Sequence, residues 1–390
     1  MTAPTDTGPH TQTGHPPRRR ILPVVIAASV ALALLLITPF PRGFQGEVTG
    51  DPALMDAAAE ALGSGHWNHL AVVRVNGDTV TEAGTGADGR TQFEIGSITK
   101  TFTAALFADA IERGEVEEST RLGEVWPELD GDVAEVTLGA IATQRSGLPR
   151  QEPAPSVGDG LATVLAGYLH TDPYRGDVTD LVRALDKVDV SDTEPEYSNF
   201  GFAVLGQALA EVAGRSYADL IRERITQPLG MDDTFVPSSA KGLSHGLTSS
   251  GLPAAPWTLG ASAPAGAIRS TPRDMAIWLQ ATMAGTAPGA AASEPREDFD
   301  ETDRIGWAWM TTTNRTPNIT WHNGGTGGYR SFLGFDRGSG TGIIVLSDSA
   351  NSVDKAIDLI SEKAAGRAAE RAAGQAMPGS RSAAEKGQSR

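Results

Sequence analysis

Ser97 and Lys100 are the pair of residues in this sequence best suited to nucleophilic chemistry. They stand three positions apart, at the start of a run rich in Ala, Leu and Phe that extends to Ile111. Because residues three apart on a helix share one face, a helix beginning near Ser97 would place the hydroxyl beside the amine. That pairing joins a nucleophile to a base. The unpaired N–H groups of the first helical turn could also stabilise an oxyanion that forms there.

The Ser-x-x-Lys pattern alone is weak evidence, because it occurs three times in the chain. Ser238 and Lys241 lie in a Pro, Gly and Ser-rich stretch, where no helix would hold them together. Ser352 opens another run of helical character, but a serine followed by Asp354 is typical of a helix N-cap. Only the run after Ser97 is apolar nearly all round, which favours a buried helix that holds the serine rigidly.

Two further stretches carry polar groups that could face the same cleft. Tyr197 and Asn199 form the one Tyr-x-Asn pattern in the chain, and in a strand or tight turn they would point the same way. A buried tyrosine beside a turn-forming asparagine is the alternative. His322 stands two residues before Gly324, in a stretch with four glycines beside a predicted strand end. Such glycines often mark the close approach of a ligand or another backbone, although a plain hairpin turn would have the same composition.

Ser244 is a rival nucleophile, because residues 242–246 match the G-x-S-x-G motif of the α/β-hydrolases. Asp300, Asp303 and His322 follow in the order of the remaining triad members. That motif, however, requires a strand before the serine and a helix after it. Pro, Ser and Gly flank Ser244 on both sides. We therefore expect Ser244 to have no catalytic role.

Composition limits the function classes. The chain has 390 residues, a formal net charge of −16 and no cysteine. Its length permits one large or two medium domains with a full core. The acidic balance argues against nucleic acid as a partner, since phosphate binding needs clustered Lys and Arg. Without cysteine there is neither a disulfide nor a thiolate metal site, and we predict no metal and no cofactor.

The N-terminal part has the features of a membrane anchor. Residues 1–20 are predicted to be a disordered tail that ends in three arginines, and Ile21–Phe40 follows without a charged residue. That apolar run has about the 20 residues that a membrane-spanning helix requires. The arginines place the N-terminus in the cytoplasm and the rest of the chain outside the cell. A cleaved signal peptide, which would release a secreted protein, is the alternative.

The remaining elements can be read along the chain. After a linker over residues 41–50 we predict a helix at 51–62, a β-hairpin of His69–Val75 and Thr79–Ala83, and mainly helical segments over 97–283. Four strand-like runs then lie at 305–310, 319–322, 329–335 and 341–347, before a final amphipathic helix from 352 to about 371. Residues 51–365 would form one domain, and 366–390 a disordered tail. Strands from both ends of the chain should form one antiparallel sheet, covered by the terminal helices.

Taken together, Ser97-x-x-Lys100, Tyr197-x-Asn199 and His322-x-Gly324 occur in the order and rough spacing of the serine β-lactamase and penicillin-binding-protein superfamily. The sequence most resembles its branch of class C β-lactamases, D-aminopeptidases and esterases, over about residues 51–365. Further stretches that resemble this branch are 143–149, 228–231, 264–271 and 324–328.

The resemblance implies an α/β fold, in which an antiparallel sheet carries the terminal helices and a helical subdomain is inserted. It implies that Ser97 is acylated and that Lys100 and Tyr197 share the proton transfers. It also implies that Asn199 orients the substrate amide, and that backbone N–H groups of Ser97 and Gly325 hold the oxyanion.

The resemblance reaches two more positions. Gln151 would correspond to a glutamine that contacts the substrate in class C enzymes. Where the β-lactamases have Lys-Thr-Gly this chain has His322-Asn323-Gly324, which is more similar to the esterases and D-amino-acid peptidases of the family. An imidazole that titrates near its unperturbed pKa of about 6.5 would attract a substrate carboxylate only when protonated. The replacement of the lysine by His322 therefore weakens the interpretation of the protein as an antibiotic hydrolase. It does not affect the prediction that the reaction proceeds through an acyl-enzyme.

The sequence therefore predicts a membrane-anchored serine hydrolase that acts outside the cell. Its substrate would be a small molecule or a peptide, such as an ester, an amide, a D-amino-acid peptide of the cell wall or a β-lactam. A catalytically idle member of the family, kept as a binding or sensing module on the membrane, is the alternative. The complete set of motifs argues against idleness.

Overall fold

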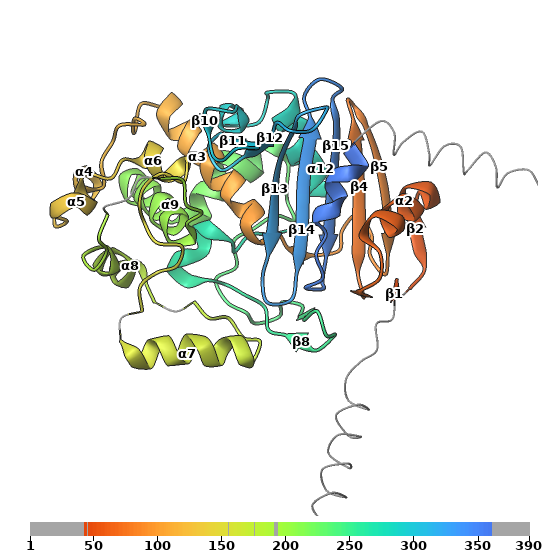
Figure 1. Cartoon of the computed structure of the whole chain (residues 1–390), viewed down its shortest axis with the longest axis horizontal. Helices are drawn as coiled ribbons and strands as arrows, with labels where there is room; N and C mark the ends of the chain where they lie inside the picture. Colours follow the sequence, from red (N-terminus) through yellow and green to blue (C-terminus); the bar gives the residue numbers. More distant parts are fainter. Residues whose placement is uncertain (1–42, 45, 155, 175, 191–193, 361–390) are drawn as a thin grey trace, which may run out of the picture. The chain divides into compact units, whose positions relative to one another are not determined.

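The computed structural model describes residues 43–360, apart from 45, 155, 175 and 191–193 (Figure 1). The predicted N-terminal tail (1–20), the predicted membrane span Ile21–Phe40 and the predicted tail 366–390 lie outside these residues. No helix within the described part is both long and apolar enough to cross a bilayer.

Nine antiparallel strands form the main sheet, in the order β10-β11-β12-β13-β14-β15-β4-β5-β2. Strands from the two ends of the chain meet where β15 pairs with β4, which confirms the predicted sheet. The strands are β2 (Val48–Gly50), β4 (Leu70–Asn76), β5 (Thr79–Thr85), β10 (Glu297–Asp298), β11 (Asp303–Ile305), β12 (Met310–Thr312), β13 (Ile319–Gly325), β14 (Arg330–Asp336) and β15 (Thr341–Ser347). The predicted hairpin is β4–β5, and its two-residue turn places Gly77 in the left-handed region at φ 54°.

Both faces of this sheet are buried, because successive side chains of a strand point to opposite faces. On β4, Leu70 and Val72 join a cluster with α2 (Pro52–Leu62) and the 3₁₀ helix η5 (Asp354–Ile360). Val73 joins the larger core on the other face. The expected cover of the sheet by elements from both chain ends is therefore confirmed.

The larger core contains α12 (Pro272–Met283), which packs on β4 and β15, and the central helix α3 (Thr99–Glu112). Further helices lie between α3 and α12 in the chain. These are α4 (Leu122–Val125), α5 (Gly131–Ala134), α6 (Leu138–Ala142), α7 (Val157–Tyr168), α8 (Val178–Leu185), α9 (Asn199–Ala213), α10 (Tyr217–Leu220), the π-helix η2 (Ile221–Thr226) and α11 (Gln227–Leu229). Figure 1 shows the labelled ones among them, α4 to α9, on the side of α3 away from the sheet. They form the helical insertion that the resemblance implied.

Three pairs of two-residue strands complete the fold. β1 (Gly43–Phe44) runs parallel to β3 (His66–Trp67), and β7 (Gly246–Leu247) pairs with β8 (Pro253–Ala254). β6 (Phe93–Glu94) pairs with β9 (Arg269–Ser270) just before Ser97, which ties the start of the nucleophile segment to a distant part of the chain.

The segment predicted as a linker, residues 41–50, contains structure, and that prediction was wrong for its second half. Val48–Gly50 forms β2 and pairs with β5 as an edge strand of the main sheet. Two features of β2 explain why the sequence did not indicate a strand here. It has three residues, and it includes Gly50 at φ 73°. So short a strand gives no alternation of polar and apolar residues to recognise.

Two other predicted elements differ in the structure. The run predicted as one strand at 305–310 is divided between β11 and β12 by a turn, in which Gly306 N–H donates to Trp309 O and Ala308 has φ 66°. The three tryptophan and alanine side chains of that turn are buried, so their apolar character signalled the core rather than a strand. The described part of the predicted final helix is the 3₁₀ helix η5, and residues 361–371 lie outside the described residues.

Candidate active site

Ser97 lies on a short 3₁₀ helix, η1 (Gly96–Ile98), that continues directly into α3. Lys100 is in the first turn of α3, and the predicted contact is present. Its Nζ lies 3.0 Å from Ser97 Oγ and donates hydrogen bonds to Asn199 Oδ1 at 2.8 Å and Ala265 O at 2.7 Å. The amine is therefore held in one position beside the serine by two acceptors from distant parts of the chain.

The surroundings of Lys100 favour its neutral form. Its side chain is completely buried, and almost every residue of α3 is buried around it. Burial is the main cause that brings the pKa of Lys100 well below its ordinary value, and the positive charge of Arg150 adds to this. A lysine whose neutral form is favoured in this way can accept a proton from Ser97 Oγ.

Tyr197 and Asn199 flank the start of α9. Ser198 caps the helix by accepting a hydrogen bond from Gly201 N–H at 2.7 Å, which fixes the loop that carries both predicted residues. Lys100 Nζ lies 4.8 Å from the centre of the Tyr197 ring. Burial raises the pKa of the Tyr197 phenol and outweighs the effect of Ser97, which lies close enough to lower that pKa, so the hydroxyl keeps its proton at neutral pH. Ser97, Lys100, Tyr197 and Asn199 thus form one cluster, as predicted.

His322 projects from β13 toward the same cluster, with its ring centre 6.3 Å from that of Tyr197. Nδ1 lies 2.6 Å from Asn323 O, and because a carbonyl can only accept, this nitrogen carries the proton. Burial, followed by the charge of Lys100, lowers the pKa of His322 to about 3. The expectation that this imidazole titrates near neutral pH was therefore wrong, because the sequence did not show that the ring is desolvated.

Gly324 and Gly325, at the end of β13, are pressed against the turn that carries Ser97. A Cβ on Gly324 would lie 2.1 Å from Ile95 O, and a Cβ on Gly96 would lie 2.5 Å from Gly325 N. Gly96 also has φ 51°, where glycine is favoured. These contacts bring the backbone of Gly325 next to the nucleophile turn, where an oxyanion-binding N–H is expected.

Gln151, the weakest of the predicted substrate contacts, lies at the rim. It is exposed, and its Oε1 accepts a hydrogen bond from the Tyr174 hydroxyl at 3.1 Å. The residue before it is more closely connected to the cluster. Arg150 O accepts from Asn199 N–H at 2.9 Å, and its guanidinium lies 5.2 Å from the centre of the Tyr197 ring.

Arg150 is the main site residue that the sequence interpretation missed. Its guanidinium supplies a positive charge that acts on Lys100, Tyr197 and Tyr174. A signal was present in the chain, because Arg150 is the neighbour of Gln151, but an arginine beside a loop glutamine has no chemical signature of its own. Only the folded structure shows that the guanidinium of Arg150 lies over the ring of Tyr197.

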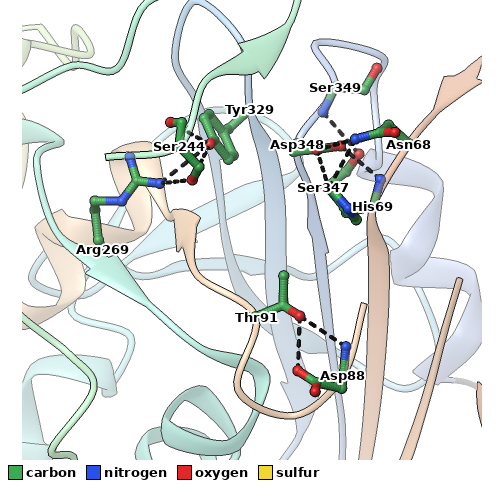
Figure 2. A network of polar contacts seen from close by, with 10 residues as sticks. All are labelled: Asn68, His69, Asp88, Thr91, Ser244, Arg269, Tyr329, Ser347, Asp348 and Ser349. Carbon is green, nitrogen blue, oxygen red and sulfur yellow. Dashed lines mark hydrogen bonds and ion pairs between the residues drawn. The ribbon is translucent and has the colours of Figure 1, made fainter. Parts of the chain in front are cut away.

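The rival nucleophile Ser244 belongs to a different network (Figure 2). Its Oγ accepts from Arg269 Nη2 at 2.7 Å and lies 3.1 Å from the Tyr329 hydroxyl, while Arg269 also pairs with buried Glu94 at 2.9 Å. The serine follows a turn and leads into β7. It therefore lacks both the preceding strand and the following helix of a nucleophile elbow. Ser244 completes the hydrogen bonding of a buried arginine.

In the described ranges, no group of three or more His, Asp or Glu side chains lies close enough to hold a metal ion. The chemistry of the cluster around Ser97 is that of a nucleophile, a base and a protonated phenol. Such a set is suited to acyl transfer through a covalent intermediate.

Comparison with known proteins places this geometry in a family. The family model described as Beta-lactamase matches residues 59–367. The D-alanyl-D-alanine-carboxypeptidase/endopeptidase AmpH of Escherichia coli (strain K12) is 25% identical over 308 residues, which cover 69% of this chain and 75% of that protein. The unguisins hydrolase ungD' of Aspergillus campestris is 26% identical over 374 residues, covering 81% of this chain and 68% of that protein.

Solved structures share the fold. A class C beta lactamase from Rhodobacter sphaeroides superposes with a TM-score of 0.67 at 21% identity, over 83% of this chain and 100% of the other. The D-alanine carboxypeptidase AmpC from Burkholderia cenocepacia gives a TM-score of 0.64 at 20% identity, over 82% and 99%. The chain therefore belongs to the beta-lactamase family, with the α/β fold seen in class C beta-lactamases, and is a serine hydrolase.

Proposed function

We propose that this serine hydrolase is anchored in the membrane and acts outside the cell, through an acyl-enzyme on Ser97. The proposed substrate is an ester, an amide, a D-amino-acid peptide or a β-lactam. One observation carries the assignment of the nucleophile, namely that Ser97 Oγ lies 3.0 Å from the amine of the completely buried Lys100.

The lowered pKa of Lys100 and the raised pKa of Tyr197 support a division of roles. Neutral Lys100 takes the proton of Ser97 Oγ as the oxygen attacks the substrate carbonyl carbon and a new C–O bond forms. When the tetrahedral intermediate collapses, the bond to the leaving group breaks and Lys100 returns the proton to that group by way of the Tyr197 hydroxyl. A water molecule then attacks the ester on Ser97 by the same route and releases the acid.

The negative charge on the carbonyl oxygen needs donors that are already in place. We assign this role to the N–H groups of Ser97 and Gly325. The close approach of Gly96 to Gly325 N supports the assignment, because it places this N–H next to the turn that carries Ser97. Asn199, whose Oδ1 is held by Lys100, can donate from its amide nitrogen to the substrate carbonyl.

The choice of substrate depends on the charges at the cleft. His322 is neutral at pH 7 because its pKa is about 3, so it cannot grip a carboxylate as a lysine would. Arg150 supplies a positive charge beside the cluster. The name of one relative, a D-alanyl-D-alanine-carboxypeptidase/endopeptidase, favours a D-amino-acid peptide, including a peptide of the cell wall.

Membrane anchoring and the extracytoplasmic location are supported by the sequence of the N-terminal segment. Ile21–Phe40 is long enough to span a bilayer and is preceded by Arg18, Arg19 and Arg20. A cleaved signal peptide in the same place would put the enzyme outside the cell without an anchor.

A hydrolysis panel tests the proposal. The parent and the Ser97→Ala variant are assayed on neutral esters, D-Ala-D-Ala peptides and β-lactams, with folding checked by thermal unfolding. We expect turnover of at least one class by the parent and none by Ser97→Ala, whose stability should change by about 1 kcal/mol at most. Equal turnover by both proteins would exclude Ser97 as the nucleophile. No turnover of any class by the parent would favour the idle binding module.

A further inference from the structure

Helix α7 carries a row of apolar side chains on its outside. Five of its apolar residues recur at helical spacing and are between 53% and 93% exposed. These residues, here called the α7 stripe, are Val157, Leu161, Val164, Leu165 and Tyr168. Leu169, which follows directly, is 62% exposed.

The helix is oriented in the opposite way to an ordinary surface helix, which turns its apolar face to the core. Ala166 is the one buried residue of α7, and Gly160 and Ala162 are half-buried. The small residues thus face the protein, while the large apolar ones face away from it. Figure 1 shows α7 along the lower edge of the view, set apart from α8 and α9.

This clustering is specific to α7. The other large apolar side chains that are exposed in the described part are scattered over five separate segments: Val48, Val80, Val212, Phe235 and Leu252. Single exposed apolar residues are normal on a protein surface, whereas a continuous group of them marks a surface that another body covers.

The position of the predicted anchor indicates what covers the stripe. The predicted span ends at Phe40, and β1 begins three residues later at Gly43. A domain attached through so short a connection stays at the bilayer surface. In Figure 1, α7 lies along the lower edge of the view and β1 lies higher, at the lower right, so both are on the lower side of the view.

Charge further restricts the occupant. Asp159 is the one charged residue between Val157 and Leu169, and the stripe itself has none. A surface that binds acidic headgroups or a charged protein would carry Lys or Arg. The apolar stripe is instead suited to the boundary between headgroups and acyl chains, where binding depends on buried apolar area.

We propose that the α7 stripe lies in the outer surface of the bilayer to which the protein is anchored, as a second point of membrane contact. The inference rests on the membrane anchor of the proposed function. The excursion that contains α7 leaves the body after Gln151 and returns at Tyr174, and the Tyr174 hydroxyl bonds to Gln151. Since Gln151 and Tyr174 lie at the rim of the active site, the contact holds the mouth of the site at the membrane surface. Substrates presented there would be favoured over those in free solution.

The test uses the full chain, reconstituted in phosphatidylcholine vesicles and, at one copy per disc, in phosphatidylcholine nanodiscs. Because the chain has no cysteine, the variant Leu165→Cys can carry a single environment-sensitive fluorophore. The control is Val80→Cys. Val80 is an exposed apolar residue of β5, and it pairs with Val75 near the end of β4 that is farther from β3. Quenching is measured with phosphatidylcholine that bears a nitroxide on its acyl chain.

We expect the nitroxide lipid to remove most of the fluorescence at position 165 and little at position 80, in both vesicles and single-copy discs. Added Leu161→Glu, which places a charge in the stripe, should abolish the quenching at 165. Thr163→Glu, which places the same charge on the same helix outside the stripe, should leave it unchanged. Salt or added anionic lipid should have little effect, because the stripe is uncharged.

Flotation and ester hydrolysis are measured in the same samples, so that failure of the α7 contact, of the membrane anchor and of the hydrolase assignment can be told apart. If the chain floats with the vesicles but position 165 is quenched no more than position 80, the α7 inference is wrong and the anchor stands. A blue-shifted emission at 165 that occurs only in vesicles with several copies would make a second protein copy the occupant, and would also overturn the inference. A chain that does not float refutes the anchor and the α7 contact together, while hydrolysis at Ser97 is judged independently.

Discussion

The buried amine of Lys100 is the group whose protonation governs the proposed acylation. Burial and the charge of Arg150 both lower its pKa, and the base must be neutral to act. Replacing Arg150 by alanine removes the second of these causes, so the pKa of Lys100 should rise. We therefore predict that the acid limb of the kcat/KM profile of Arg150→Ala moves to higher pH.

The profile is measured with a neutral ester, so that substrate binding does not involve the lost charge. Arg150→Lys keeps a positive charge and should keep the parent profile. An unchanged acid limb in Arg150→Ala would show that Arg150 does not act on the base. With an anionic peptide, the same variant should also raise KM, by up to about five-fold for an exposed charge pair.

His322 makes the folded protein sensitive to acid. Its pKa is about 3 in the folded state and 6.5 in the unfolded chain, so between these values the unfolded chain binds more protons. The free energy of unfolding therefore falls as the pH drops below about 6.5, by about 2 kcal/mol at pH 5. Urea unfolding of the parent and of His322→Gln at pH 7.5 and pH 5 measures this. The variant should lose about 2 kcal/mol less between the two pH values, and an equal loss in both proteins would mean that His322 is not the cause.

The identity of the clustered residues could be predicted from their spacing, but their electrostatics could not. Ser97 and Lys100 are one helical turn apart, and Tyr197 and Asn199 flank a helix start, so local rules bring each pair together. The burial of His322 results from contacts with residues more than a hundred positions away, among them Tyr197. The position of Arg150 over the Tyr197 ring depends on the same kind of distant contact.

Among the structural elements, the end of β13 limits how the site can be built. A Cβ on Gly324 would lie 2.1 Å from the Ile95 carbonyl oxygen, which is backbone and cannot move aside alone. On Gly325 the nearest atoms would be the end of the Arg330 side chain, at 2.9 Å, which can move. We predict that Gly324→Ala costs about 3 kcal/mol in stability and removes most of the activity. Gly325→Ala should cost under about 1 kcal/mol in stability.

Thermal unfolding and ester turnover of these two variants give the comparison. Both substitutions add one methyl group to the same strand, so each serves as the control for the other. Equal losses of stability in the two variants would contradict the proposed packing of β13 against the nucleophile turn.

Elements with strong local signals were predictable. The hairpin β4–β5 has its turn at Gly77-Asp78, and α2 is capped by Asp51, whose carboxylate accepts from Leu54 N–H at 2.8 Å. The division between β11 and β12 had no such signal, because the apolar residues at Gly306–Trp309 suit a buried turn as well as a strand. The three-residue strand β2 forms because β5 offers it an edge, which is a property of the whole sheet.

At the scale of the whole molecule, the sheet that joins both chain ends and the inserted helices could be inferred from the order of elements. The outward stripe of α7 could not, since its helical periodicity alone would place those residues in a core. Its orientation is a tertiary feature. The membrane anchor likewise remains a prediction, because Ile21–Phe40 lies outside the described residues.

Protease treatment of intact cells tests the topology. With a tag at Met1 and the arginines before Ile21 holding it inside, protease should remove the domain and spare the tag. A mature protein in the medium that begins beyond Phe40 would instead establish a cleaved signal peptide. Protection of the whole chain in intact cells would contradict an extracytoplasmic domain of either kind.

The nucleophile is tested most directly by trapping the acyl-enzyme and locating it. The parent, Ser97→Ala and Ser244→Ala are each incubated with a fluorophosphonate and with a slowly turned over ester or β-lactam, and their intact masses and labelled peptides are measured. We predict one adduct per chain in the parent and in Ser244→Ala, located on the peptide that contains Ser97, and none in Ser97→Ala. An adduct that persists in Ser97→Ala, or that disappears in folded Ser244→Ala, would contradict the account.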